Sequence, residues 1–327
     1  MTGTTAEAKI TVMGAGAYGL ALASVLAQGG RNVALWGRDG AKIAKLENMQ
    51  RVQSLLTAVN LQPNLRLIGP ELTQVGDVVL LCVPSQELRG LLTRFQTLLA
   101  DKTLVICCKG IEHATGALPS QIVAEFCPGA QIAVLTGPSF AVDLMVGKPT
   151  ALTLAGAPSF GRQLQELLST PLMRLYLTGD VLGAQWGGAL KNVIAIGAGV
   201  AMGAGLGESA RAALMTRGFA EMQRLAVDQG AFAQTLAGLS GFGDLILTCT
   251  SGQSRNFSYG FALGQRQPVQ INQTVEGVKT AHAVAKRYGQ AMPVANILAS
   301  FLSDEVDLKT AIKTSLDRPL KEEITYR

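Results

Sequence analysis

The residue that most clearly invites a chemical role is a lysine within a long run of small and apolar residues. Lys191 is the one charged residue in the segment 185–205. Charged side chains are rarely buried unless they are paired. Gly187, Gly188 and Ala195 share its helical face and are expected to leave a hollow around the ammonium group. We therefore predict a proton donor that also binds an anion, and pairing with a core carboxylate or extension to solvent is the alternative.

Polar residues elsewhere in the chain are candidates for the same site. Lys109 follows the apolar segment VICC, and Asp244 follows the glycine-flanked turn GFG. Ser254, Arg255 and Asn256 combine a helix-capping hydroxyl, a guanidinium and an amide, a set that suits a phosphate group. Ordinary solvated side chains at Lys109 and Arg255 are the alternative.

A glycine-rich motif, G-x-G-x-x-G, occupies residues 14–19 between a predicted strand and a predicted helix. In that setting Gly14 allows a tight turn, Gly16 lets a pyrophosphate approach the backbone, and Gly19 lets helix and strand pack closely. The N-terminus of the following helix favours anions. The motif therefore predicts dinucleotide binding.

The residues after the second predicted strand bear on the choice of dinucleotide. Folds that prefer NAD usually place an acidic residue there for the ribose 2′-hydroxyl. This chain has Arg38 instead, which suits a 2′-phosphate, and Asp39 is expected to cap the next helix. The sequence favours NADP(H), with NAD(H) as the alternative.

The apolar pattern predicts the scaffold that positions these residues. Apolar runs, most of them separated by helical patterns, predict strands at 10–13, 33–36, 77–83, 103–108, 131–135, 151–154 and 173–177. Continuous apolar strands that alternate with helices are typical of a parallel sheet covered on both faces. Ligands of such sheets bind beyond the carboxyl ends of the strands, where the segments 83–85, 109–110 and 137–141 are expected.

The character of the sequence changes near residue 180. Beyond it we find helical periodicity and glycine clusters but no convincing strand. With 327 residues, two domains are the natural expectation. We predict a dinucleotide-binding domain at 1–182 and an all-helical substrate-binding and catalytic domain at 183–327.

Composition excludes several classes of protein. The net charge of +5 is scattered along the chain, which argues against a nucleic-acid surface. The five cysteines lack the paired spacing of a zinc site, no metal is expected, and reduced cysteines are typical of a cytoplasmic protein. The uncharged stretch 192–207 is too short and too weakly apolar for a membrane span. A small anionic partner suits the mild positive charge.

Together these segments resemble the bacterial-type NAD(P)-dependent glycerol-3-phosphate dehydrogenases. The matches follow the family order over most of residues 8–290: GAGAYGLALA, LWGRD, VPSQ, CKGIE, LTGPSFA, GGALKNVIAIGAG, ARAALMTRGFAEM, GFGDLILTCTS, SRNFSYG and TVEGVKTA. The resemblance implies an N-terminal Rossmann-type doubly wound, mostly parallel sheet, a C-terminal all-α domain and usually a homodimer. It also implies reversible reduction of dihydroxyacetone phosphate to sn-glycerol 3-phosphate, which feeds glycerophospholipid synthesis.

The resemblance also assigns roles to residues. Lys191 would be the catalytic proton donor in the reduction and the acceptor in the oxidation, and Asp244 would orient Lys191 or bind a substrate hydroxyl. The implied substrate-binding residues are Lys109, Gly137, Ser139, Lys191, Asp244, Ser254, Arg255 and Asn256. The implied cofactor-binding residues are Gly14, Gly16, Ala17, Tyr18, Gly19, Arg38, Lys109, Ala141, Arg255, Thr274 and Glu276.

Two other functions remain open at this point. One is another lysine-dependent dehydrogenase of the same two-domain plan, acting on a hydroxy acid or on a ketoacid such as ketopantoate. The other is a non-catalytic NADP-binding sensor, which would not need Lys191, Asp244 and Arg255 together.

Overall fold

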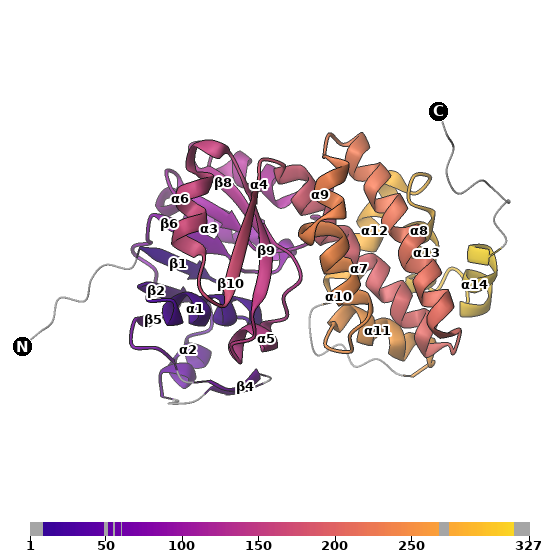
Figure 1. Ribbon diagram of the computed structural model, residues 1–327, viewed down its shortest axis with the longest axis horizontal. Coiled ribbons are helices and arrows are strands. Elements are labelled where there is room, and N and C mark those ends of the chain that lie inside the picture. The colour runs from indigo at the N-terminus through magenta and orange to yellow at the C-terminus, as the bar shows by residue number, and fades with distance from the viewer. Residues whose placement is uncertain (1–8, 49–51, 55, 60, 268–274, 317–327) are drawn as a thin grey trace, which may run out of the picture.

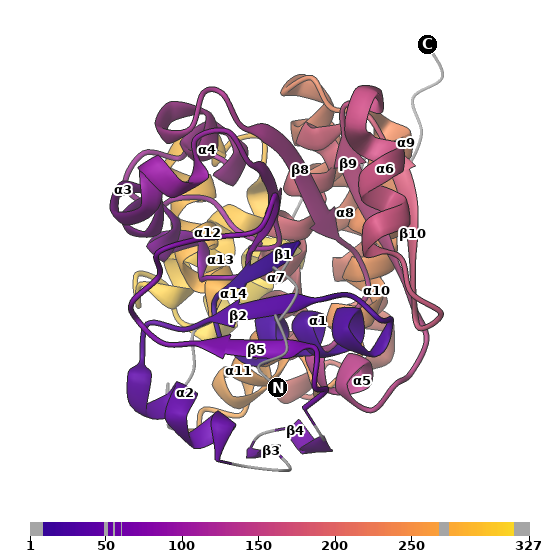
Figure 2. The same ribbon diagram turned by 90° about the vertical axis from the view of Figure 1, so that its left-hand side faces the viewer.

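The computed structural model describes residues 9–48, 52–54, 56–59, 61–267 and 275–316. Its largest element is an eight-stranded sheet in the order β10-β9-β8-β7-β6-β1-β2-β5 (Figures 1 and 2). The strands are β1 (Ile10–Met13), β2 (Val33–Trp36), β5 (Leu65–Ile68), β6 (Val78–Leu81), β7 (Thr103–Ile106), β8 (Gln131–Thr136), β9 (Thr150–Gly156) and β10 (Met173–Thr178). All neighbours pair in parallel except β8 and β9, which are antiparallel. The expected mostly parallel, Rossmann-type sheet is confirmed.

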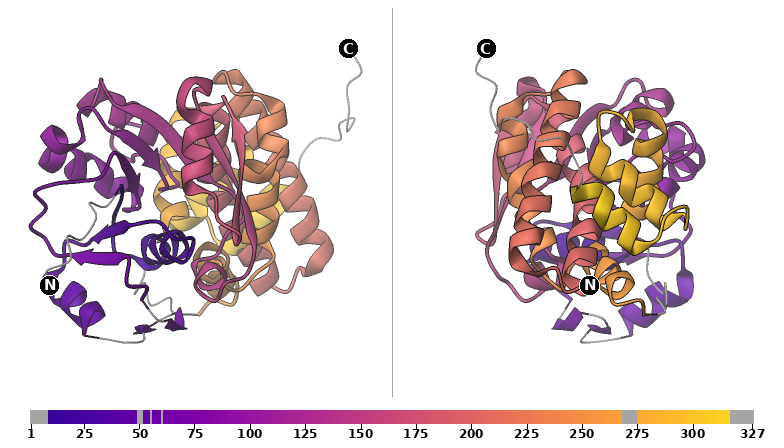
Figure 3. Two further views of the ribbon diagram at one scale, coloured as in Figure 1. Left: turned by 60° about the vertical axis from the view of Figure 1, so that its left-hand side comes forward. Right: turned by 90° about the vertical axis from the view of Figure 1, so that its right-hand side faces the viewer.

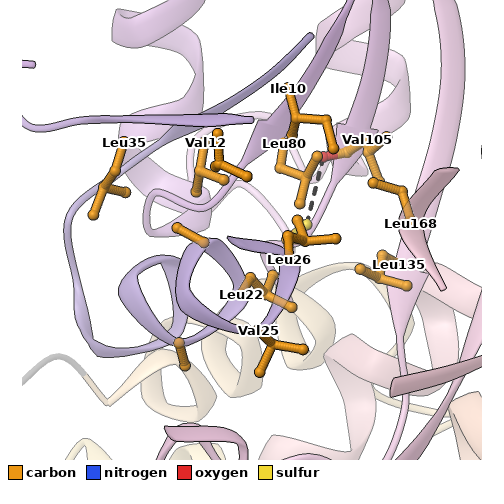
Figure 4. Close-up of a cluster of buried hydrophobic side chains, with 14 of the residues drawn as sticks. Ile10, Val12, Leu22, Val25, Leu26, Leu35, Leu80, Val105, Leu135 and Leu168 are labelled. Carbon is orange, nitrogen blue, oxygen red and sulfur yellow. Dashed lines mark hydrogen bonds between the residues drawn. The ribbon is translucent and has the colours of Figure 1, made fainter. Parts of the chain in front are cut away.

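The central strands form because their apolar runs are buried on both faces. Every residue of β1, β2 and β6 is buried. Alternate side chains point to opposite faces of a strand, so Val12 lies in one core and Met13 in the other. Figure 4 shows the first core, where Leu22, Val25 and Leu26 of the helix α1 (Ala17–Gln28) pack against the strands.

Helices cover both faces of the sheet, as a doubly wound fold requires. One core takes side chains from α1, α2 (Gly40–Glu47), α5 (Ala141–Met145) and α6 (Pro158–Leu168). The other takes them from α3 (Leu88–Leu99) and α4 (Pro119–Phe126). Asp39 caps α2, as the sequence predicts, because its side chain accepts a hydrogen bond from the backbone N–H of Lys42 at 3.0 Å.

The helices that follow β10 gather beside the sheet (Figures 1 and 3). Their centre is α7 (Val181–Gly203), which is buried from Gly183 to Ala201. The elements that follow it are α8 (Gly207–Asp228), α9 (Ala233–Ala237), the π-helical turn η2 (Leu239–Gly243), α10 (Asp244–Cys249), α11 (Arg255–Gly264), α12 (Glu276–Tyr288), α13 (Pro293–Leu302) and α14 (Leu308–Leu316). Within the described part of the chain, no strand follows β10.

Glycines bring α7 and α11 unusually close together. A Cβ added at Gly199 would lie 2.1 Å from the carbonyl oxygen of Phe257, and one at Gly260 would lie 2.0 Å from that of Ile196. Only a residue without a side chain fits at either place, so the glycine clusters of the sequence are helix–helix contacts. This packing fixes α7 at the centre of the helical half.

Two parts of the sheet domain escape the sequence analysis. The edge strand β5 was not predicted, because its sequence LRLI contains an arginine and the strand is only partly buried. The short antiparallel pair β3 (Val52–Ser54) and β4 (Leu56–Val59) was not predicted either. All seven strands that the sequence predicts are present, with bounds that differ by a few residues.

Candidate active site

The glycine-rich turn joins β1 to α1 and leaves the N-terminus of that helix open. Gly14 has a φ of +124°, and a Cβ there would lie 2.6 Å from the carbonyl oxygen of Cys82. A Cβ at Gly19 would lie 2.0 Å from the Gly14 carbonyl oxygen, so close packing excludes any side chain. A Cβ at Gly16 would meet nothing within 4 Å. The turn therefore offers exposed backbone at a helix N-terminus, the arrangement that binds a pyrophosphate.

A cavity of about 440 Å³ begins at this turn and extends between the ends of β2 and β6. Three cationic side chains and two carboxylates line its polar side: Arg38, Lys42, Arg94, Asp39 and Glu87. Arg38 is exposed and forms an ion pair with Glu87 at 2.8 Å. The residues fit the adenosine end of a dinucleotide, which needs a cavity next to the phosphate-binding turn.

A buried aspartate lies between two lysines that come from opposite halves of the chain. Asp244, which begins α10 and is 1% exposed, accepts a hydrogen bond from Lys191 Nζ at 2.5 Å through Oδ1. Its Oδ2 accepts one from Lys109 Nζ at 2.7 Å. Lys191 also donates to Thr248 Oγ1 at 2.8 Å. One carboxylate therefore fixes two ammonium groups side by side.

The environment of Lys191 brings its pKa closer to neutral pH. Burial disfavours the charged form and lowers the pKa of Lys191 to about 8. The Asp244 carboxylate opposes this shift, and the charge of Lys109 adds to it. A lysine in this state exchanges its proton near physiological pH, which suits an acid–base catalyst.

The glycines beside Lys191 have a different role from the predicted one. A Cβ at Gly187 would lie 2.5 Å from the Ser240 carbonyl oxygen, and one at Gly188 would lie 2.9 Å from Thr136 Oγ1. These glycines let η2 and β8 approach α7 closely. The expectation that they leave a hollow around the ammonium group is wrong, because backbone and Thr136 occupy that space.

Tyr18 connects the glycine-rich turn to the two lysines. Its hydroxyl lies 3.0 Å from Ser139 Oγ, and its ring centroid lies 6.0 Å from Lys109 Nζ. Burial raises the pKa of Tyr18 far above its ordinary value, so the phenol is neutral. Lys109 also donates to the Gly137 carbonyl oxygen at 3.2 Å. Lys109, Gly137 and Ser139, three predicted substrate-site residues, thus lie next to the predicted cofactor turn. Two predicted cofactor residues also lie close by, since Ala17 begins α1 and Ala141 begins α5, and these helices contact each other.

The predicted phosphate-binding segment opens α11. Ser254 caps that helix by accepting from the backbone N–H of Phe257 at 3.2 Å, as expected. Arg255 is exposed at the first helical position. Asn256 is buried, and its amide donates to Asn192 Oδ1 and accepts from the Gly277 backbone N–H, both at 3.0 Å. Asn256 therefore ties α11 to α7 and α12.

Glu276 links the start of α12 to the sheet domain. It accepts hydrogen bonds from Ser85 Oγ at 2.6 Å and from Ser85 N at 3.2 Å. Burial raises the pKa of Glu276, and those two hydrogen bonds and the charge of Arg255 oppose the shift. Thr274, the other cofactor residue implied for this segment, lies outside the described residues.

The sequence analysis missed three residues that support the site: Thr248, Asn192 and Lys42. Thr248 follows Asp244 by one helical turn, a spacing that could have revealed it. Asn192, the partner of Asn256, carried no signal because it comes from a distant segment. Ser85 lies in the segment 83–85, which was expected at a strand end, but its contact with Glu276 was not predicted. Lys42 lies on the helix that Asp39 caps.

Metal-ligating clusters and membrane-spanning helices are both absent from the described residues. No group of three or more histidine, cysteine, aspartate or glutamate side chains is placed there to hold a metal ion. None of the described helices has the length and apolar character to cross a bilayer.

Comparison with known families and proteins covers both halves of the chain. Residues 9–159 match the family model for the N-terminus of NAD-dependent glycerol-3-phosphate dehydrogenase, and residues 180–313 match the model for its C-terminus. The chain belongs to the NAD-dependent glycerol-3-phosphate dehydrogenase family. It is an oxidoreductase, as the resemblance predicts.

Individual relatives agree with the family assignment over nearly the whole chain. A protein of Roseobacter denitrificans named glycerol-3-phosphate dehydrogenase [NAD(P)+] is 50% identical over 96% of this chain and 99% of its own. One of the same name from Cereibacter sphaeroides is 51% identical over 96% of this chain and 100% of its own. The crystal structure of glycerol-3-phosphate dehydrogenase from Coxiella burnetii has a TM-score of 0.88 at 33% identity, covering 94% of this chain and 98% of that one.

Proposed function

We propose that this protein catalyses the reversible reduction of dihydroxyacetone phosphate to sn-glycerol 3-phosphate with NAD(P)H, and so supplies glycerophospholipid synthesis. The observation that carries the proposal is the buried contact of Asp244 with both Lys191 and Lys109, beside the glycine-rich turn. It supports a dehydrogenase because a lysine with a lowered pKa is held where a bound substrate would meet the cofactor.

Lys191 is the proton-transfer residue of the proposed mechanism. An ammonium group has three donors, and two of them are taken by Asp244 and Thr248. The third donor has no partner among the described residues, and it would donate to the carbonyl oxygen of the substrate. When bound, the nicotinamide supplies the hydride that reduces the carbonyl carbon. Lys191 neutralises the negative charge on the oxygen and then delivers the proton.

Asp244 is the positioning residue in this scheme. Its two oxygens hold Lys191 and Lys109, so both ammonium groups stay in place before substrate arrives. Lys109 retains one donor beyond its bonds to Asp244 and Gly137, and that donor would bind substrate. Preorganised charges of this kind act without further rearrangement during the reaction.

The phosphate of the substrate is assigned to the start of α11. Arg255 is exposed there, and the helix N-terminus adds its own preference for an anion. Ser254 and Asn256 support this position through the cap and through the contacts with α7 and α12. Binding the phosphate would orient the carbonyl for reaction.

The cofactor is assigned to the glycine-rich turn and to the cavity that follows it. Gly14, Gly16 and Gly19 shape the turn, and the open N-terminus of α1 suits the pyrophosphate. Arg38 and Lys42 line the part of the cavity where a 2′-phosphate would bring negative charge. We therefore propose that NADP(H) is preferred and that NAD(H) is also accepted.

The remaining proposals concern the domain division, the oligomeric state and the cellular location of the chain. We propose a dinucleotide-binding domain at 1–182 and a helical substrate-binding domain at 183–327, in a cytoplasmic homodimer. The change from sheet to helix between Thr178 and Val181 supports this division. Sedimentation of the purified protein tests the dimer, and a monomeric mass would contradict it.

A single set of absorbance assays tests the proposed reaction. Oxidation of NADPH and of NADH is measured with dihydroxyacetone phosphate, with ketopantoate and other ketoacids as the control substrates. We expect turnover with dihydroxyacetone phosphate and faster reaction with NADPH. Turnover with a ketoacid alone would favour the other dehydrogenase class, and no turnover with any substrate would favour a sensor.

A further inference from the structure

Two oppositely charged side chains meet across the crevice above the glycine-rich turn. In the sheet, β2 and β6 lie on either side of β1. Arg38 follows β2, and Glu87 lies in the short helical turn η1 (Ser85–Glu87) that follows β6. Their ion pair at 2.8 Å therefore spans the cavity that begins at the turn.

This ion pair contributes little to folding. The side chains of Arg38 and Glu87 are 74% and 51% exposed. Exposed ion pairs are weak, because water and salt screen the attraction and the side chains lose freedom. The contact is therefore easily opened by a competing anion, and its place in the cavity matters more than its strength.

Glu87 is the carboxylate of this cavity that is able to contact a bound nucleotide. Of the lining residues, only Asp39 and Glu87 are acidic. Asp39 is already engaged as the cap of α2 through the backbone N–H of Lys42. Glu87 has only the exposed guanidinium of Arg38 as a described partner.

The two cofactors place opposite demands on such a carboxylate. A phosphate monoester carries about −1.5 to −2 charges at pH 7, so a 2′-phosphate needs Arg38 and is repelled by Glu87. A ribose 2′-hydroxyl can donate a hydrogen bond, and a carboxylate can accept it. The same glutamate therefore disfavours one cofactor and suits the other.

We propose that Glu87 is a specificity-determining residue that weakens the binding of NADP(H) and allows the protein to use NAD(H) as well. Arg38 attracts the 2′-phosphate, and Glu87 limits that preference by competing for the guanidinium. The inference rests on the proposed function, since it concerns the choice between the two cofactors of that reaction.

Binding of two nucleotide fragments tests the proposal without any catalytic step. Adenosine 2′,5′-bisphosphate and adenosine 5′-monophosphate are titrated calorimetrically into the wild type, Glu87→Gln and the control Glu125→Gln. Glu125 also pairs with an arginine, Arg89, and is exposed, but it lies on α4 outside the cavity lining. The control therefore matches the change in net charge.

We expect Glu87→Gln to bind the bisphosphate about fivefold more tightly than the wild type does. Its affinity for the monophosphate should be unchanged or lower, and the gain should shrink at high salt. Glu125→Gln should leave the ratio of the two affinities at the wild-type value. An unchanged ratio in Glu87→Gln, or an equal shift in both variants, would overturn the proposal.

Steady-state kinetics separate this inference from the proposed function. In Glu87→Gln the ratio of KM for NADPH to KM for NADH should fall by a similar factor. If the wild type does not turn over dihydroxyacetone phosphate, the proposed function fails. The fragment titrations still decide the role of Glu87 in that case.

Discussion

At the scale of single residues, the site depends on one carboxylate that serves two cations. Removing a buried partner usually leaves an uncompensated charge and strongly destabilises a protein. Here either lysine can be lost while Asp244 keeps the other, at 2.5 Å or 2.7 Å. This redundancy allows the function of each lysine to be tested in a folded protein.

Replacement of Lys191 tests the assignment of the proton donor. We expect Lys191→Ala to lower turnover on the order of 100- to 1000-fold or more, because charge on the substrate oxygen is no longer neutralised. Cofactor affinity, measured by fluorescence titration, should stay near the wild-type value. Lys148→Ala removes an exposed lysine that pairs with Asp143 and is the matched control. Turnover close to that of the control would refute the assignment.

The pH dependence follows from the proton affinity of the same residue. The pKa of Lys191 is lowered to about 8 by burial. Oxidation of glycerol 3-phosphate needs the neutral amine, so its kcat/KM should rise with pH through about 8. Reduction of dihydroxyacetone phosphate needs the ammonium form, so its kcat/KM should fall over the same range. Profiles of both directions at constant ionic strength check this, and parallel trends would exclude Lys191 as the shared acid and base.

At the scale of elements, the position of Lys191 depends on how α7 is packed. The lysine lies in the middle of a helix that contacts α8, α10, α11 and α12. At Gly199 and Gly260 the backbones of α7 and α11 touch without side chains between them. The run of small residues in α7 is thus required for close helix packing, and this packing holds Lys191 in a fixed position.

Two glycine-to-alanine changes should have opposite effects on stability. A Cβ at position 199 would meet the Phe257 carbonyl oxygen at 2.1 Å, so Gly199→Ala should destabilise by about 1–3 kcal/mol or more. A Cβ at Gly90 in α3 would meet nothing within 4 Å, so Gly90→Ala should stabilise by about 0.5–1 kcal/mol. Denaturant unfolding of the cofactor-free proteins measures both. Equal effects would show that α7 and α11 can separate at little cost.

The sequence predicts elements well where a local signal exists. The strand β1, the turn that starts at Gly14, and the caps Asp39 and Ser254 all have local patterns, and the structure confirms them. The contacts of Asp244 have none, since it lies 53 residues from Lys191 and 135 from Lys109 along the chain. Such pairings follow from the packing of α10 against α7 and of α7 against β8, which no short window of sequence contains.

At the scale of the whole molecule, several contacts join the sheet half to the helical half. Ser85 donates to Glu276, Lys109 donates to Asp244, and Ser120 exchanges hydrogen bonds with Gln185. Each crosses from a segment before α7 to one in or after it. The cofactor cavity borders η1, which contains both Ser85 and Glu87. Nucleotide binding is therefore expected to stabilise more than the sheet domain alone.

Thermal unfolding with added nucleotide tests the assignment and the preference of the cofactor. A ligand that binds only the folded state at 100 times its Kd stabilises by about 2.7 kcal/mol. NADP⁺ should raise Tm by several degrees, and NAD⁺ at equal concentration should raise it less. Scanning calorimetry with each nucleotide makes the measurement. No shift with either nucleotide would contradict the cofactor assignment, and a larger shift with NAD⁺ would reverse the preference.

The shared aspartate also limits how the two halves can be exchanged between relatives. Lys109 comes from the segment after β7, whereas Lys191 and Asp244 come from the helical half. A hybrid enzyme joined near residue 180 would combine a lysine from one parent with a carboxylate from the other. Recombination at that junction is therefore expected to give an active enzyme only where both parents place the equivalents of Lys109, Lys191 and Asp244 in the same relative positions. A library of such hybrids should first be selected for parents that meet this condition.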